Sequence, residues 1–375
     1  MTTALVPRTV FVIASLQRGG SEGQLVELIS HLAPRLMGAR VATIAAEADA
    51  EHLEALEDGG VEVCRLAPSS VTGVRRLTAA GMRLDRLLRR TEAELVYAWG
   101  PHATMIGVPL AHRLGIPAIV ARRQVALEGR RRLTFDRLVS AVEARAELVT
   151  ANSAAVTKDA LSRGIAPSRL RIVRNGHRVQ ERLPTPPPDP VVLGYVAAFR
   201  PGKGHDRLLA AIPYVHAGAS WRVDLAGGGP LLERVRDEVQ ARQLDHRVRV
   251  LGMVRDVHEF WRSRHAAVLL SGAEGSSNAL IEAGLAGRPL LATAVAGNSE
   301  LIPPGAGVLV PPDDPVATAG ALGRLIDDPR LRERLGQAAH EHMRTFDVAT
   351  MAEGHLRAMV EAHGEGVRRR YRPGA

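Results

Sequence analysis

The chain has 375 residues, 46% hydrophobic and 24% charged, a balance typical of a globular protein long enough for two domains. Its net charge of +9 favours anionic partners such as nucleotides, phosphates or an anionic membrane surface, and 3% aromatic residues disfavour nucleic-acid binding by base stacking. The single cysteine, Cys64, excludes an intrachain disulfide and a thiolate metal cluster, and it fits a reducing, cytoplasmic setting.

In the first half of the chain, short apolar runs alternate with segments of helical period. The helices are expected at 21–37 and 51–60, and the apolar runs predict strands at 9–16, 39–46, 61–67, 94–99, 117–122 and 147–152. The first run is too short to span a membrane. We therefore expect βαβ units with a largely parallel sheet, in a cytoplasmic protein whose peripheral contact with the inner face of a membrane stays open.

The segment 183–190, "LPTPPPDP", holds five prolines and predicts a stiff linker. Beyond it the alternation restarts, with strands expected at 191–199, 221–229, 247–252, 266–272 and 288–295. The chain is thus predicted to be an α/β protein with two doubly wound, Rossmann-like domains facing across a cleft, where ligands are expected at the strands' carboxyl ends. The predicted parts are an N-terminal domain (1–183), a linker (184–190), a C-terminal domain (191–348), and a helix with a basic tail (349–375) that packs back on the first domain.

The stretch "EGSSNALIEAGLAG" (274–287) places charge where a strand passes into a helix. Glu274 follows an expected strand, and Ser276 or Ser277 is suited to cap the helix that begins there. Free amides in the first helical turn, with Gly275 allowing close approach, favour an anion. Glu282 lies one turn further on, and carboxylates accept hydrogen bonds from paired hydroxyl groups. A nucleotide-diphosphate sugar, with its ribose diol, diphosphate and sugar hydroxyls, fits this pattern.

This stretch, with "GRPLLAT" after it, resembles the signature of the retaining family-four glycosyltransferases of the B-type fold (GT-B). Five further segments resemble that family in the same order along the chain: "GGSE" (19–22), "VRNGHRV" (173–179), "PGKGHDRLLAA" (201–211), "LAGGGP" (225–230) and "VLGMV" (250–254). Together they cover most of the chain.

The resemblance implies roles for individual residues. Glu274 would contact the transferred sugar, Glu282 the ribose hydroxyls and Lys203 the diphosphate. The other donor-binding residues that it implies are Gly19, Gly20, Gly252, Val254, Gly275, Ser276, Ser277 and Asn278. It further implies transfer with retention, no cofactor, and a leaving diphosphate stabilised by basic side chains and amides without a metal. A UDP-sugar is the commonest donor in the family, and the acceptor would be a glycan, a lipid-linked or a small molecule.

Two positions depart from the family's pattern. The arginine expected five positions before Lys203 is Ala198 here, and we expect Arg200 to take its catalytic part. The histidine that many members carry after the strand at 117–122 is Arg123 here. We expect His102, Arg122 and Arg123 on the acceptor side.

Three other functions are compatible with parts of the pattern. Ala198 favours a non-catalytic nucleotide-sugar-binding protein or partner subunit of the same fold. A hexosamine 2-epimerase shares the two-domain architecture, but the pair Glu274 and Glu282 disfavours it. A nicotinamide oxidoreductase is disfavoured because "LQRGGSEGQ" (16–24) lacks the complete G-x-G-x-x-G turn and no acidic ribose partner follows.

Overall fold

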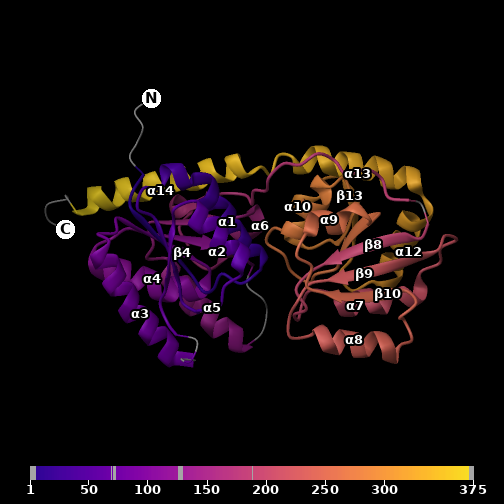
Figure 1. The fold of residues 1–375 in the computed structure, drawn as a ribbon, viewed down its shortest axis with the longest axis horizontal. Coiled ribbons are helices and arrows are strands. Elements are labelled where there is room, and N and C mark those ends of the chain that lie inside the picture. The colour runs from indigo at the N-terminus through magenta and orange to yellow at the C-terminus, as the bar shows by residue number, and fades with distance from the viewer. Residues whose placement is uncertain (1–5, 69, 71–72, 126–129, 188, 371–375) are drawn as a thin grey trace. The chain divides into compact units, whose positions relative to one another are not determined.

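The computed structural model describes residues 6–68, 70, 73–125, 130–187 and 189–370, and the chain forms two compact units (Figure 1). The first unit comprises Met1–Gly176 and Val348–Ala375, and the second comprises His177–Asp347. The chain therefore passes from one unit to the other after Gly176 and returns after Asp347. The expected boundary at residue 183 lies seven residues inside the second unit.

In the described part of the first unit, seven parallel strands form one sheet in the order β3-β2-β1-β4-β5-β6-β7. The strands are β1 (Thr9–Ile13), β2 (Arg40–Thr43), β3 (Glu62–Arg65), β4 (Leu95–Trp99), β5 (Ala118–Arg122), β6 (Leu148–Ala151) and β7 (Leu170–Ile172). Successive side chains of β1 enter different cores, since Phe11 and Ile13 belong to one apolar cluster and Val10 and Val12 to the other. This burial on both faces explains why the strand is continuously apolar.

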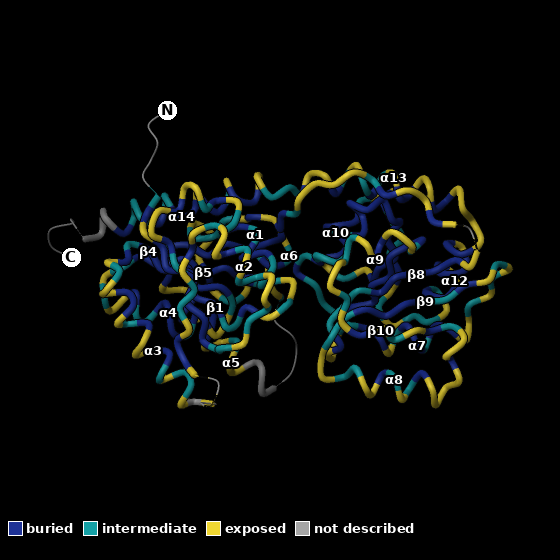
Figure 2. The backbone as a smooth tube through the Cα atoms, in the orientation of Figure 1, coloured by how far each residue is buried: buried dark blue, intermediate teal, exposed yellow. Residues whose placement is uncertain are grey.

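Helices cover both faces of that sheet. They are α1 (Gly20–Leu32), α2 (Ala50–Asp58), α3 (Gly73–Arg90), α4 (Pro101–Leu114), α5 (Arg130–Glu143), α6 (Ala154–Ser162) and α14 (Val348–Arg370), with 3-10 turns η1 (Ala33–Arg35) and η2 (Pro167–Arg169). Buried residues of α1, α2 and α14 join the cluster of Phe11, whereas those of α3, α4 and α6 join the cluster of Val10. In Figure 2 the central strands β1, β4 and β5 are dark blue, whereas the surrounding helices carry most of the yellow.

The helix α14 completes the first unit although it comes last in the chain. It packs beside α1, as the yellow ribbon in Figure 1 shows. Its buried His355 accepts or donates a 2.5 Å hydrogen bond between its Nδ1 and the hydroxyl of Tyr97 in β4. Gly354 lies so close to Val173 that a Cβ would come within 2.8 Å of a valine methyl. The return of the C-terminal helix thus fills the first core.

The described part of the second unit repeats this design with six parallel strands in the order β10-β9-β8-β11-β12-β13. The strands are β8 (Val191–Val196), β9 (Trp221–Ala226), β10 (Val248–Gly252), β11 (Ala266–Leu269), β12 (Leu290–Thr293) and β13 (Gly307–Val310). The helices are α7 (His205–Ala211), α8 (Leu232–Ala241), α9 (Val257–Arg262), α10 (Asn278–Leu285), α11 (Ala296–Leu301), α12 (Pro315–Asp327) and α13 (Pro329–Met343), with a 3-10 turn η3 (Ile212–Tyr214). Two doubly wound α/β domains were predicted, and this fold class is confirmed.

The proline segment does not act as a free linker in the structure. Arg288 donates a 2.9 Å hydrogen bond to the carbonyl of Pro184, and a ring nitrogen of His265 lies 2.8 Å from the carbonyl of Pro187. Leu183 is buried in the second core. Because proline lacks an N–H but keeps its carbonyl, the segment can still be held by donors from the second unit.

The strand order reverses between β8 and β11, which are neighbours in the second sheet although β9 and β10 lie between them in sequence. Ligands of open α/β sheets bind beyond the carboxyl ends of strands at such a reversal. The hydroxyl of Tyr195 fixes this point: it donates to the carbonyl of Lys203 (2.5 Å) and accepts from the amide of Leu270 (3.0 Å). One buried side chain therefore joins the loops that follow the two strands.

Replacing Tyr195 with phenylalanine tests this connection. We expect Tyr195→Phe to lower the free energy of unfolding by about 1–3 kcal/mol, because the buried amide of Leu270 and the half-buried carbonyl of Lys203 lose their partner. Tyr214→Phe is the matched control, since Tyr214 is 52% exposed and has no side-chain hydrogen bond within the described residues. Urea denaturation measures both; equal stability of the two variants would contradict the prediction.

Candidate functional site

Lys203 lies in the turn between β8 and α7. Gly202 and Gly204 on either side have φ values of +84° and +73°, which residues with a Cβ rarely adopt. A Cβ on Gly204 would also lie 2.0 Å from the carbonyl oxygen of Leu270, so this turn packs directly on the end of β11. The "GKG" sequence thus places the lysine at the strand-order reversal.

Glu274 follows β11, and its carboxylate meets Lys203. The Nζ of Lys203 lies 2.6 Å from Oε1 of Glu274, while the lysine side chain is 34% exposed and the glutamate side chain 10% exposed. The two residues are 71 positions apart in sequence and meet because β8 and β11 are adjacent. An ammonium group has three N–H donors, so Lys203 retains donors for a second anion.

The helix α10 begins immediately after this loop. Ser277 is its N-cap, and its Oγ accepts a 3.4 Å hydrogen bond from the amide of Leu280. The alternatives Ser276 and Ser277 are thereby resolved in favour of Ser277. A helix N-terminus next to Lys203 combines a partial positive charge with a full one, which suits a bound anion.

Glu282 and Asn278 lie one turn apart on α10 and share a contact with His177. The Nε2 of His177 lies 3.3 Å from Oδ1 of Asn278, and its Nδ1 lies 3.8 Å from Oε1 of Glu282. Burial raises the pKa of Glu282 to about 7, although a third of the side chain reaches solvent. His177 was interpreted from sequence as a structural residue. Its position directly after the Asn-Gly of "VRNGHRV" was the available signal for a site role.

Gly297, in α11, allows this helix to approach the Glu274 loop. A Cβ at this position would lie 2.3 Å from the carbonyl oxygen of Glu274 and 2.5 Å from that of Gly275. Real Cβ atoms do not approach backbone oxygens so closely. The glycine was not singled out from sequence, because the close contact joins segments that only the fold brings together.

The strands β9 and β10 supply the next part of the same edge. The amide of Gly227 donates a 2.8 Å hydrogen bond to the carbonyl of Gly252, and a Cβ on Gly227 would meet the carbonyl of Ala197 at 2.0 Å. Gly252 is buried, Met253 is 55% exposed, and Val254 is half-buried. The structure therefore places Gly252 and Val254 at the carboxyl end of β10, beside the loop after β9.

Arg200, the expected replacement for the arginine missing at Ala198, is exposed. Its side chain has no hydrogen bond or ion pair within the described residues, whereas its carbonyl accepts a 3.2 Å bond from the amide of Lys203. Arg200 thus shares a turn with Lys203 and has a free guanidinium there. Its catalytic part stays a prediction.

The first unit presents its predicted residues at the carboxyl ends of β1 and β4, where its own strand order reverses. Gly19 caps α1, and a Cβ on it would lie 2.4 Å from the Glu22 carboxylate, which folds back over it. Gly20 opens α1 and is exposed. His102 is exposed in the first turn of α4, with its ring centroid 5.7 Å from that of Phe135.

Arg122 and Arg123 are adjacent in sequence, but their side chains lie in different environments. Arg122 is buried and forms ion pairs with Glu143 and Asp159. Arg123 is also buried, and it stacks over Trp99 at 4.8 Å and donates a 2.5 Å hydrogen bond to Asn175. Burial lowers the pKa of Arg123 to about 10, and no carboxylate pairs with it within the described residues. This arrangement favours Arg123 over Arg122 as an anion-binding residue.

Comparison with known proteins assigns the family. Residues 18–181 match the family described as "Glycosyltransferase Family 4", and residues 179–342 match "Glycosyl transferases group 1". In addition, HepE of Anabaena, solved in complex with UDP-glucose, shares the fold with a TM-score of 0.81 over 92% of this chain and 97% of HepE, at 20% identity. The chain belongs to the family-four type of glycosyltransferases with the GT-B fold.

Two curated relatives illustrate the range of this family. The chain is similar to the lipopolysaccharide core biosynthesis glycosyltransferase LpsD of Rhizobium meliloti, with 34% identity over 45% of this chain and 49% of LpsD. It is 29% identical to a D-inositol 3-phosphate glycosyltransferase of Acidothermus cellulolyticus, over 69% of this chain and 63% of the relative. The match spans less than two thirds of the length of either relative.

The described residues form neither a candidate metal site nor a candidate membrane span. Within them, no group of three or more His, Cys, Asp and Glu side chains is arranged to hold a metal ion. None of the helices in that part of the chain combines the length and apolar character required to cross a membrane.

Substituting Gly297 tests how the Glu274 loop is held. We expect Gly297→Ala to lower the free energy of unfolding by about 1–3 kcal/mol, because the added methyl must displace backbone rather than a flexible side chain. Gly320→Ala in α12 is the matched control: no atom lies within 4 Å of its added Cβ, and we expect a gain of up to about 1 kcal/mol. Chemical denaturation that ranks the two variants as equal would show that α11 does not constrain the loop.

Proposed function

We propose that this protein is a retaining glycosyltransferase that transfers a sugar from a nucleotide-diphosphate sugar, with a UDP-sugar as the first donor to test. The observation that carries the proposal is the 2.6 Å ion pair between Lys203 and Glu274 beside the N-terminus of α10. It combines a cation, helix amides and a carboxylate, the three groups that a diphosphate sugar requires. The binding of UDP-glucose by HepE supports this choice of donor.

The proposal assigns the diphosphate to Lys203 and to the amides at Gly275, Ser276 and Ser277. Lys203 keeps N–H donors after pairing with Glu274, so phosphate binding does not require the ion pair to break. Arg200 adds a second cation from the same turn. These donors stabilise the charge that develops on the leaving diphosphate, so the proposal needs no metal ion.

The two carboxylates are assigned to the hydroxyl groups of the donor. Glu274 orients the transferred sugar while Lys203 holds its carboxylate in place. Glu282 accepts from the ribose hydroxyls, and His177, which contacts both Glu282 and Asn278 of α10, positions it. Gly252 and Val254 lie at the end of β10, where the base is assigned.

In the proposed reaction, the bond between the anomeric carbon and the phosphate oxygen breaks, and a bond from the acceptor hydroxyl oxygen to that carbon forms on the same face. The acceptor's proton passes to an oxygen of the leaving phosphate, so the products are the glycoside and the nucleoside diphosphate. On the first unit, Gly19 and Gly20 are assigned to the donor phosphates, and His102 and Arg123 to a glycan, lipid-linked or small-molecule acceptor. We assign Arg122 a structural role, because its guanidinium group already forms two ion pairs.

A non-catalytic nucleotide-sugar-binding protein is the second candidate, and Ala198 is the observation that favours it. Both candidate functions predict that the protein binds a nucleotide sugar, but only the glycosyltransferase is expected to turn it over. A hexosamine 2-epimerase would instead release a free, epimerised sugar.

A donor screen with two lysine variants tests the proposal. We expect one nucleotide sugar to raise the melting temperature, to be slowly hydrolysed, and to yield a glycoside with the donor's anomeric configuration by NMR. Lys203→Ala should lower turnover by about tenfold to a hundredfold, because a charge-assisted hydrogen bond of roughly 1.5–3 kcal/mol is lost from the transition state. Lys158→Ala, at the chain's other lysine, is exposed on α6 and should leave turnover unchanged.

Each alternative result has a distinct meaning. Binding without hydrolysis or transfer would favour the non-catalytic protein, and a free epimerised sugar would favour the epimerase. Inversion at the anomeric carbon would disprove retention. Equal turnover of Lys203→Ala and Lys158→Ala would exclude Lys203 from the reaction, and absence of stabilisation by every nucleotide sugar would reject donor binding.

The raised pKa of Glu282 predicts pH-dependent donor binding. A charged carboxylate accepts hydrogen bonds more strongly than a neutral one by about 1 kcal/mol, so donor affinity should rise several-fold as pH increases through about 7. The folding stability of the free protein depends on pH in the opposite sense. Because burial favours the neutral form of Glu282, its contribution to the free energy of unfolding is complete below the ordinary pKa of 4.5 and is lost as pH rises through 7. Calorimetry with a nucleotide sugar, whose diphosphate does not titrate near neutrality, measures the binding.

Two variants separate Glu282 from its neighbour. Glu282→Gln should bind the donor more weakly than wild type at high pH and with little dependence on pH. His177→Asn retains a polar side chain and removes the imidazole that lies 3.8 Å from Glu282, so the rise in affinity near pH 7 should persist in this variant. A pH profile that Glu282→Gln leaves unaltered would assign the dependence to another group.

A further inference from the structure

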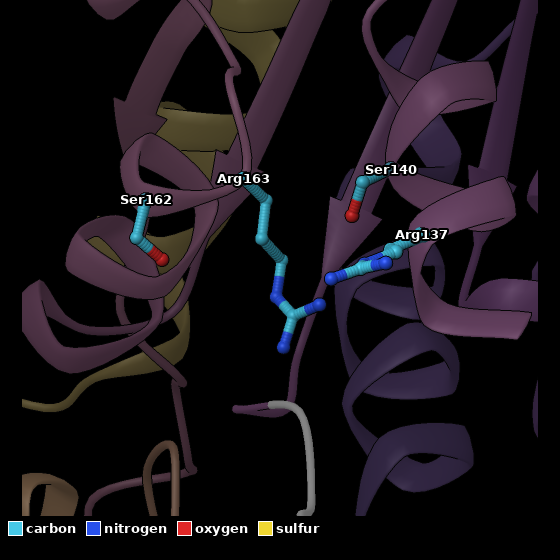
Figure 3. Close-up of a pocket in the computed structure, with 4 residues that line it drawn as sticks. All are labelled: Arg137, Ser140, Ser162 and Arg163. Carbon is cyan, nitrogen blue, oxygen red and sulfur yellow. The ribbon is translucent and has the colours of Figure 1, made fainter. Parts of the chain in front are cut away.

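A hollow in the first unit lies between α5 and α6 and has no part in the proposed reaction. Its volume is about 420 Å³, and it is lined by Arg137 and Ser140 of α5, Ser162 at the end of α6, and Arg163 after it. Figure 3 shows that the guanidinium groups of Arg137 and Arg163 extend toward each other in this space. Because α6 runs back from the carboxyl end of β6, its last residue lies away from the edge that carries Gly19 and His102.

The charges around the hollow do not balance. Next to the hollow, Arg122 pairs with Glu143 and Asp159. Asp159 also accepts a hydrogen bond from the Nε of Arg163 at 3.2 Å. Arg137 is exposed and pairs with no carboxylate within the described residues. Three guanidinium groups thus face two carboxylates, and Arg163 bonds Asp159 only through its Nε, which leaves its outer nitrogens without a hydrogen bond to the described residues. The excess positive charge faces the hollow.

The buried hydroxyl of Ser140 also indicates a ligand in the hollow. The residue is 4% exposed, and its buried Oγ has no hydrogen-bond partner. A helical serine usually donates to the carbonyl four residues earlier, and Figure 3 shows this hydroxyl on the side that faces Arg137. A buried polar atom without a partner is unfavourable by about 1–3 kcal/mol, and a ligand oxygen in the hollow would satisfy it.

We infer that this hollow binds the phosphate group of a phosphate ester. The two arginines and Ser140 offer hydrogen-bond donors around one space, whereas the hydroxyl of Ser162 already donates to the carbonyl of Asp159 at 2.8 Å. A phosphate has enough acceptor oxygens to meet donors from several sides. A carboxylate has only two oxygens and would leave donors unmet. The volume exceeds that of a phosphate, so the esterified group also has room. Exposed Leu138 on α5 and Leu161 on α6 are suited to the apolar part of an anionic lipid, but a soluble phosphate ester has the same binding chemistry.

The test uses the full chain with inorganic phosphate as the probe and potassium chloride at equal ionic strength as the reference. Phosphate should raise the melting temperature of the wild type, and Arg137→Gln should weaken phosphate affinity by about tenfold or more, since a charge-assisted contact is lost. Arg86→Gln, on α3 of the same unit, is the matched control because Arg86 is exposed and has no ion pair in the described chain.

Ser140→Ala separates binding from folding. The unliganded variant should be as stable as the wild type or more stable, because a buried hydroxyl without a partner is removed, while phosphate affinity should fall about three- to tenfold. Lys203→Ala should retain this binding, so that failure of the donor proposal and failure of this one are distinguishable. Equal phosphate affinity in the wild type, Arg137→Gln and Ser140→Ala would overturn the inference.

Sedimentation with vesicles identifies the source of the phosphate. Binding to phosphatidylcholine vesicles that contain phosphatidylglycerol, but not to pure phosphatidylcholine, with loss in Arg137→Gln and not in Arg86→Gln, would assign a lipid headgroup. Stabilisation by phosphate without vesicle binding would assign a soluble phosphate ester. Absence of both would reject the site.

Discussion

The candidate donor site depends on the pairing of β8 with β11. These strands lie side by side although two strands separate them in the chain, and their ends bring Lys203 within 2.6 Å of Glu274. The Tyr195 hydroxyl bridges the two following loops, the absence of a side chain at Gly204 allows them to pack closely, and its absence at Gly297 allows α11 to approach the Glu274 loop. The chemistry proposed for this edge is thus a consequence of strand order, because neither loop carries a cation and a carboxylate of its own in this geometry.

The cationic side chains discussed above differ in whether a carboxylate pairs with them. Lys203 and Arg122 each have a carboxylate partner, whereas Arg123 and Arg137 lack one among the described residues. A buried or clustered cation without a counter-ion is unfavourable in the free protein, and an anionic ligand removes that penalty. Binding an anion at Arg123 or Arg137 would therefore be favoured by the neutralisation of a cation that has no carboxylate partner among the described residues.

Several elements were predictable because their local signals agree with the fold. The strands at the centre of both sheets are buried on two faces, so their apolar runs are unbroken. The strands β7 and β13 were missed because they are short edge strands whose residues are mostly half-exposed, and Arg171 interrupts β7. The proline segment was predicted as a linker from its composition alone. The hydrogen bonds that hold it come from His265 and Arg288, which are remote in sequence, so local patterns did not reveal them. The contact of His177 with α10 was missed for the same reason.

The sequence by itself determined the two doubly wound domains, the glycine-flanked Lys203, and the Glu274–Glu282 segment with its serine cap, because periodicity, turn residues and capping act within a few positions of the chain. Only the tertiary structure decided which charged and polar side chains meet: Lys203 with Glu274, Arg122 with Glu143 and Asp159, and His177 with Glu282. It also decided that Val348–Arg370, which was expected to pack on the first domain, does so beside α1. These outcomes depend on strand order and on packing between distant segments, which local patterns do not encode.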